Sequence, residues 1–280
     1  MNEILVFMAP AICMCIILAG ICGYVGIHVL LREVIFIDIA LAQIAALGVS
    51  FGLFLGLDLS DPIIFLVSLA FTLLAAFLLS ASQQLSHIVP QEAFIGILYA
   101  TGAAAVILAG DRLAHGAEQV HDLMVGHLLW VNWQEVTVYL IIYLILGLIY
   151  ALIHKRLLHI SQLYKSKNKN NKSYMLWDFI FYAMMGVLVA FAVRVAGVLL
   201  VFGFLIVPAV IGFLLGKTFS SRLAIGWTTG VLISLIGSYL SYVLDFPTGG
   251  MVVVTLGAAI FLVALSKIVL LFLSPRQAAG

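Results

Sequence analysis

The sequence predicts an all-α protein, a bundle of about eight or nine helices that cross a membrane. The 280-residue chain is 65% hydrophobic and only 9% charged, whereas soluble domains are about 45–50% apolar and about 25% charged. Apolar runs of about 20 residues recur along the chain, which is the length needed to cross about 30 Å of hydrocarbon. The first run is too long for a cleavable signal peptide, and further runs follow it. We therefore expect one transmembrane domain over residues 1–280.

Each predicted span is an apolar run bounded by polar or charged residues. The sixth and seventh spans are separated only by Arg194-Val195-Ala196-Gly197, so this pair is also compatible with one bent or re-entrant unit. The predicted spans are 4–30, 34–57, 62–80, 93–110, 136–154, 177–193, 197–216, 223–243 and 250–273.

The distribution of Lys and Arg predicts the orientation of the chain in the membrane. Residues 155–172 form the most basic polar segment, and we expect a cytoplasmic loop over about 155–176. Placing this loop inside leaves only Arg112 and Arg194 on the outer side, as the positive-inside rule requires. The N-terminus is then outside and the C-terminus in the cytoplasm.

The second span carries the polar groups with the clearest functional meaning. Residues 36–56 hold Asp38 and Gln43, and glycines follow at 48, 52 and 56. A carboxylate in hydrocarbon costs at least about 2.5–3.5 kcal/mol, so it faces the bundle interior, a partner or a water-filled path. Asp38 is a candidate ligand or proton carrier in a translocation path, or a residue that pairs with Arg32 or caps a helix. Glycines four residues apart predict close packing against a neighbouring helix.

The predicted outer loop at 111–135 offers a second set of metal-binding side chains. Histidine suits zinc and other first-row cations, whereas carboxylates suit harder ones. The loop is also compatible with an amphipathic helix lying at the membrane surface, anchored by Trp130 and Trp133. The candidates for an outer cation funnel are His115, Glu118, His121 and Asp122.

Two further positions interrupt the pattern of plain apolar helices. Pro208 lies inside the seventh span, and we expect a helix break there, either in a transport path or as a packing kink. Glu92 follows Pro90 at the start of the fourth span, where an acidic residue favours a helix N-terminus. A role for Glu92 in a gate is the alternative.

Several classes of function are excluded by the motifs that the sequence lacks. There is no nucleotide-binding GxxxxGK[ST] motif, so the chain does not hydrolyse ATP itself. Its carboxylates are scattered over both sides and form no pair for acid/base chemistry. We expect no enzyme activity, no permanently bound cofactor and no nucleic-acid partner, only contact with membrane lipid.

Four stretches in this order resemble the membrane permease subunits of zinc/manganese/iron-type metal-ion ABC transporters. The resemblance implies a translocation path formed by two permease copies. It also implies a cytoplasmic ABC ATPase dimer and an external metal-binding lipoprotein or periplasmic protein that delivers the ion. The stretches are LREVIFIDIALAQIAALGVSFG at 31–52, PQEAFIGILYA at 90–100, VAGVLLVFGFLIVPAV at 195–210 and SYVLDFPTGG at 241–250.

The chain departs from the family pattern at two places. The family carries an aspartate and, four residues later, a histidine in the second helix, which align here with Ile39 and Gln43. Asp38 lies one residue early. The family's acidic coupling segment, which docks on the ATPase, is replaced in the 155–176 loop by a basic one.

Together these features predict a permease subunit of an ATP-driven importer of divalent metal ions in a bacterial cytoplasmic membrane. The metal ion, zinc, manganese or iron, is the transported substrate, and Asp38 with Gln43 would face its path. An autonomous secondary metal/proton transporter or channel is the first alternative. A transport-inactive structural homologue is the second.

Overall fold

The protein is a bundle of helices, as expected. The computed structural model describes residues 2–58, 61–112, 125–164 and 172–273. In these ranges eight helices are long and apolar enough to cross a membrane, and no strand occurs among the described residues. The prediction of an all-α, polytopic membrane protein is confirmed.

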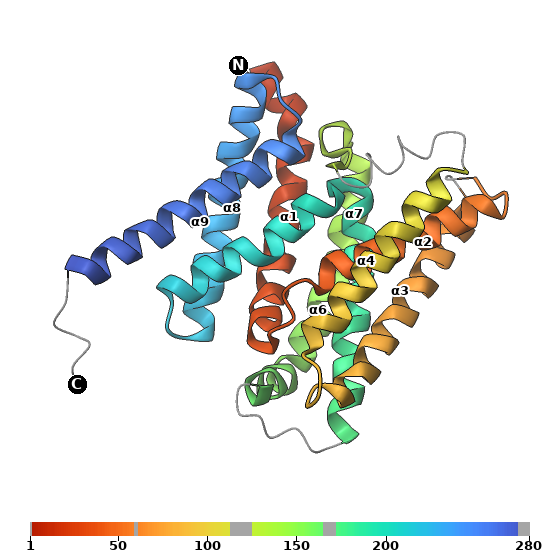
Figure 1. The fold of residues 1–280 in the computed structure, drawn as a ribbon. Coiled ribbons are helices and arrows are strands. Elements are labelled where there is room, and N and C mark those ends of the chain that lie inside the picture. The colour runs from red at the N-terminus through yellow and green to blue at the C-terminus, as the bar shows by residue number, and fades with distance from the viewer. Residues whose placement is uncertain (1, 59–60, 113–124, 165–171, 274–280) are drawn as a thin grey trace, which may run out of the picture.

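Residues 33–36, 216–218 and 245–247 are short connections between consecutive helices (Figure 1). Two short 3₁₀ helices, η1 (Gln83–Leu85) and η2 (Leu128–Trp130), lie between them. The membrane-length helices are α1 (Asn2–Arg32), α2 (Ile37–Phe54), α3 (Pro62–Ser82), α4 (Gln91–Gly110), α6 (Trp133–Leu163), α7 (Lys172–Leu215), α8 (Phe219–Leu244) and α9 (Thr248–Leu273).

Side-chain caps explain where several helices begin. The Asp61 carboxylate accepts the backbone N–H of Ile63 at the start of α3, which has Pro62 as its first residue. Asn132 and Glu135 form a capping box at the start of α6. Each cap satisfies backbone donors that the first turn of a helix leaves free, and so fixes the helix start.

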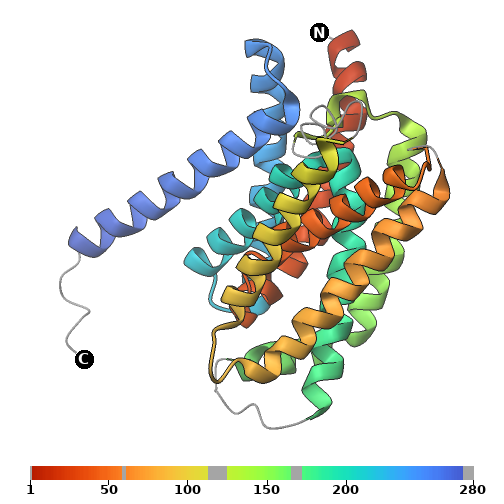
Figure 2. The same ribbon diagram turned by 45° about the vertical axis from the view of Figure 1, so that its right-hand side comes forward.

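The core of the bundle is made by α1, α2 and α7, which are mostly buried, whereas α4 and α9 are mostly exposed. In both Figure 1 and Figure 2 the C-terminal half of α9 extends away from the other helices. Its apolar side chains, such as Phe261 and Leu265, are therefore exposed. The inner position predicted for the second span is confirmed by the burial of α2.

A sharp bend divides α7 into two halves. Gly197 has φ 76° and ψ 159°, a backbone conformation that only glycine adopts readily. Figure 1 and Figure 2 show the helix reaching this bend and then running back at an angle to its first half. The backbone N–H of His127 donates to the Val195 carbonyl at 2.9 Å, which covers the bend. The predicted sixth and seventh spans are thus two limbs of one bent element.

The predicted helix break at Pro208 is wrong, because within α7 only Gly197 leaves the helical conformation. The fixed φ of proline is itself helical, and membrane helices accommodate proline where neighbours compensate the lost hydrogen bond. At this point α8 approaches closely with two glycines. A Cβ at Gly226 would lie 3.1 Å from the Pro208 carbonyl oxygen, and one at Gly230 would lie 3.7 Å from the proline ring. Pro208 is therefore a position of close contact between α7 and α8.

Contacts between connections define the two ends of the bundle. At the end called here the Arg32 end, the turn after α1 meets the start of α4, and the last turn of α6 meets the first turns of α7. At the opposite, Gly197 end, residues 125–127 meet the bend of α7 and the start of α9. Basic residues gather at the Arg32 end: Arg32, Lys155, Arg156, Lys217 and Arg222.

The predicted glycine contact of the second span is confirmed for two of its three glycines. A Cβ at Gly48 would lie 2.6 Å from the Cα of Ser68, and one at Gly52 would lie 2.5 Å from Cγ1 of Ile64. The Ser68 hydroxyl also donates to the Ala45 carbonyl at 2.8 Å, which joins α2 to α3. Gly56 instead has φ 84°, and a Cβ added there would have no atom of a neighbouring helix within 4 Å.

Gly48→Val is expected to lower the melting temperature of the purified protein. The added side chain would force α2 and α3 apart, and overpacking of this kind costs about 1–3 kcal/mol. The matched control is Gly96→Val on α4, where an added Cβ meets nothing within 4 Å. Fluorescence-detected size-exclusion chromatography after heating measures both variants. Equal melting temperatures for the two would contradict the close α2–α3 contact.

Candidate functional site

Asp38 lies in the first turn of α2, near the Arg32 end. Its side chain is only 2% exposed, and its Oδ1 has no hydrogen-bond partner among the described residues. The expected alternative that Asp38 pairs with Arg32 is wrong, because Arg32 pairs with Asp178. A carboxylate in the first turn is favoured by the helix dipole, but a buried oxygen without a donor costs free energy. The site therefore has an unused acceptor.

A second carboxylate lies close to this acceptor. One oxygen of Glu92, at the start of α4, accepts the backbone N–H of Ile35. Its other oxygen, Oε2, is buried and has no partner among the described residues. Asp38 lies near enough to Glu92 for the two carboxylates to repel each other when both are charged. Asp38 and Glu92 thus form an acidic cluster at the start of α2, where α1, α2 and α4 meet.

Gln43 is also buried, with 2% of its side chain exposed. It faces α4, because a Cβ at Gly102 would lie 3.2 Å from the Cβ of Gln43. Five residues turn an α-helix by about 140°, so Gln43 and Asp38 lie on different faces of α2. Among the described residues no three His, Cys, Asp or Glu side chains are grouped to hold a metal ion. Any ion passing here would meet few protein ligands at once.

The residues predicted to form an outer funnel lie outside the described residues, since His115, Glu118, His121 and Asp122 fall within 113–124. The two tryptophans that follow are described. Trp130 and Trp133 are both exposed at the Gly197 end, as expected for aromatic side chains at a membrane interface.

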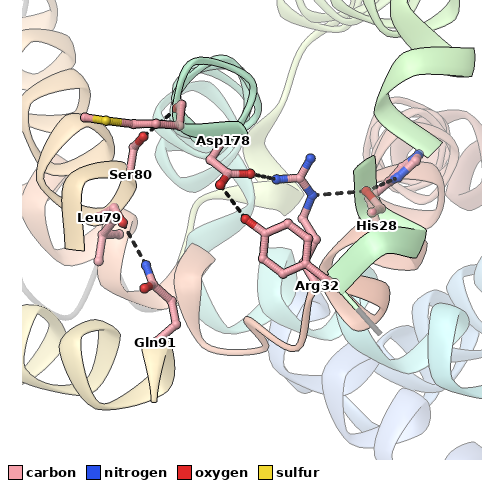
Figure 3. Close-up of polar contacts among 9 residues, drawn as sticks. His28, Arg32, Leu79, Ser80, Gln91 and Asp178 are labelled. Carbon is pink, nitrogen blue, oxygen red and sulfur yellow. Dashed lines mark hydrogen bonds and ion pairs between the residues drawn. The ribbon is translucent and has the colours of Figure 1, made fainter. Parts of the chain in front are cut away.

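A buried ion pair joins α1 to α7 at the Arg32 end (Figure 3). The Arg32 Nη1 donates to Oδ1 of Asp178 at 2.6 Å, and both side chains are buried. The second Asp178 oxygen accepts the hydroxyl of Tyr164, the residue that follows α6. The guanidinium also lies 4.2 Å from the centre of the Phe181 ring. Arg32 is therefore held by a carboxylate and an aromatic face together.

The same arginine extends the network to α6. Its Nε donates to the Ser161 hydroxyl at 3.0 Å, and Nδ1 of His28 lies 3.0 Å from that oxygen. In Figure 3 Arg32 stands between Asp178 on one side and His28 on the other. This network links the inner helix α1 to the two helix ends that flank residues 165–171.

Sequence reasoning did not identify this network. Arg32 was expected as a possible partner of Asp38, and Asp178 was not considered. The available signal was a lone acidic residue in an otherwise apolar span, which in membrane proteins usually has a buried partner.

Further hydrogen bonds tie the α3–α4 turn to its neighbours (Figure 3). Nε2 of Gln91 donates to the Leu79 carbonyl at 2.7 Å, and the Ser80 hydroxyl donates to the Met175 carbonyl at 2.8 Å. The start of α4, where Glu92 lies, is thereby fixed to α3, and α3 is fixed to α7. The acidic cluster of Asp38 and Glu92 and the Arg32–Asp178 ion pair consequently lie at the same end of the bundle, joined by these hydrogen bonds.

The chain is similar to known transport proteins along almost its whole length. The family model described as "ABC 3 transport family" matches residues 5–268. The chelated iron transport system membrane protein YfeC of Yersinia pestis is 26% identical over 258 residues, which is 92% of this chain and 85% of that protein. The manganese import system permease protein ScaB of Streptococcus parasanguinis is 23% identical over 272 residues, 97% of this chain and 92% of that protein.

Solved structures show the same fold. A chain of PsaBC from Streptococcus pneumoniae, in complex with Fab, superposes with a TM-score of 0.73 at 22% identity, covering 92% of this chain and 90% of that one. A chain of an ABC transporter in an inward-facing conformation superposes with a TM-score of 0.67 at 19% identity, covering 94% of this chain and 88% of that one.

Proposed function

Because the chain belongs to the ABC 3 transport family, we propose that it is the permease subunit of an ATP-driven importer of divalent metal ions. It is a multi-pass inner-membrane protein and a metal-type transport permease, not itself an enzyme. Manganese and chelated iron, named for two relatives, and zinc are the candidate substrates. The ion is cargo, and no permanently bound cofactor is required.

The observation that carries the proposal is the unused acceptor of Asp38 in the inner helix of a family permease. We place Asp38 and Gln43 along the path of the ion, with a second copy of the chain completing that path. Glu92 adds a further carboxylate oxygen at the Arg32 end. Sparse ligands suit transport, because an ion that binds too strongly is not released. Oxygen ligands without imidazole favour a harder cation such as manganese over zinc.

The two ends of the bundle support where the proposed partners would bind. The basic residues gathered at the Arg32 end support a cytoplasmic location for that end and for the C-terminus, with the N-terminus outside. A cytoplasmic ABC ATPase dimer would then dock at the Arg32 end, where α6 ends and α7 begins. The expected loop over 155–176 is wrong in its bounds, because α6 continues to Leu163 and α7 starts at Lys172. An external metal-binding lipoprotein or periplasmic protein would deliver the ion at the Gly197 end.

Isolation of the full chain from native membranes in mild detergent tests this function. The expected result is a complex that contains an ATPase subunit and two copies of the chain, and that hydrolyses ATP. The rival function, a secondary transporter driven by protons through Asp38, predicts a chain that purifies alone and still moves metal across liposomes. That second result would overturn the proposal.

A further inference from the structure

A groove of about 870 Å³ lies between α1, α6 and the first half of α8. It lies apart from the start of α2, where the ion path was placed. Its walls are almost entirely apolar, with contributions from Ile17 and Ile21 of α1, Leu140 and Leu144 of α6, and Leu223 of α8. Because it opens within the membrane-spanning helices, its natural surroundings are lipid rather than water.

The groove has the length of an acyl chain. It follows α6 from Leu140 to His154, which is about 21 Å at about 1.5 Å per residue. One leaflet of a bilayer contributes about 15 Å, half of the hydrocarbon core. The groove is therefore long enough to hold the whole length of a single acyl chain from the leaflet at the Arg32 end.

A hydrogen-bonded pair of polar side chains lies towards one end of the groove, which Tyr143 and Trp227 also line along its length. The Tyr24 hydroxyl and Nδ1 of His154 lie 2.8 Å apart at the Arg32 end. One turn away along α6, Tyr150 lines the groove with 1% of its side chain exposed, and its hydroxyl has no partner among the described residues. The Tyr150 hydroxyl is too deeply buried to meet a molecule in the groove, so the Tyr24–His154 pair is the polar group that a lipid would reach at this end.

Positive charge flanks the same end. Lys155 follows His154 directly, and Lys217 precedes the lining residue Phe219 by two positions; both lysines are exposed. Lysines at the membrane surface attract anionic lipid headgroups. An apolar groove with a Tyr–His pair and two lysines at one end matches the order of groups in an anionic phospholipid.

We propose that this groove binds one acyl chain of an anionic phospholipid from the leaflet at the Arg32 end. The phosphate lies at Lys155 and Lys217, and the ester region of the lipid lies beside the Tyr24–His154 pair. A bound lipid would fill the space that α6 and α8 leave beside α1, where the three helices do not pack together. The inference does not depend on transport, and only the name of the leaflet depends on the proposed orientation.

Native mass spectrometry of the full chain, titrated with phosphatidylglycerol or with phosphatidylcholine, tests the proposal. Gly147→Leu places a side chain in the groove, where a Cβ would meet only Cδ1 of Ile21, at 3.9 Å. It is expected to weaken phosphatidylglycerol binding about tenfold, since each displaced CH₂ loses its contact. Lys155→Gln with Lys217→Gln is expected to weaken it about 30-fold and to remove the preference over phosphatidylcholine.

The matched control is Gly257→Leu on α9, which lies outside the groove and also has open space around its Cβ. It is expected to leave lipid binding unchanged. Equal binding of the two lipids by the wild-type protein, or undiminished binding by either groove variant, would overturn the proposal. Loss of a dimer by Gly147→Leu without loss of lipid would also overturn it, by making the groove a protein interface. If Gly147→Leu yields no folded protein, the variant Lys155→Gln with Lys217→Gln tests the lipid site instead, because both lysines are exposed and their replacement should not disturb the fold.

Discussion

Replacing Asp38 with alanine is expected to abolish metal uptake while leaving the amount of protein in the membrane unchanged. Asp38 provides the one carboxylate of α2 and has a buried oxygen without a donor among the described residues. An ion that enters the path loses its water only where protein oxygens replace it. Without this carboxylate the cation would meet no charged ligand from α2. Uptake of radiolabelled manganese into cells that carry the variant measures the loss.

Two companion variants make this result specific. Asp38→Asn keeps the size of the side chain and removes only its charge, so it should also lose uptake. Asp58→Ala changes an exposed aspartate just beyond the other end of α2 and should transport normally. Full uptake by Asp38→Ala at normal membrane levels would show that Asp38 only starts a helix.

Replacing Arg32 with leucine is expected to give the largest loss of stability. The change removes the partner of a buried Asp178 carboxylate, together with the Ser161 contact and the position over Phe181. Breaking a buried ion pair from one side costs about 3–5 kcal/mol, because the remaining charge stays buried. The melting temperature in mild detergent should fall by about 10 °C.

The control for this loss is another arginine near the same end. Arg156 is exposed and lies 5.5 Å from the centre of the Trp177 ring, so Arg156→Leu should change stability by less than about 1 kcal/mol. The double variant Arg32→Leu with Asp178→Leu should recover much of the loss, since neither charge remains buried. If Arg32→Leu melts like the Arg156 variant, the ion pair does not hold α1 to α7.

Local patterns in the sequence predicted much of the fold. Apolar runs located the spans, and the spacing of Gly48 and Gly52 predicted the close α2–α3 contact that the structure shows. The break at residues 194–197 was also found in the sequence, because a polar residue and a glycine interrupt an apolar run there. In each case the signal lies within a few neighbouring residues.

Other features depend on partners far away in the chain. Arg32 and Asp178 are 146 residues apart, and nothing in one sequence pairs them. Pro208 was expected to break its helix, but the backbone stays helical there, and α8 approaches Pro208 closely at Gly226. The apolar run around Asp38 predicted that its side chain is buried. Its position near the Arg32 end could be seen only in the structure, which shows where the turn at 33–36 lies.

We propose that this chain moves metal only when a separate ATPase drives it. The most direct measurement is metal accumulation in proteoliposomes that contain the chain with its copurified ATPase, compared with the chain alone. We predict ATP-dependent accumulation of a divalent metal by the complex and none by the chain alone. Equal accumulation by the chain alone under a proton gradient, without ATP, would contradict the claim.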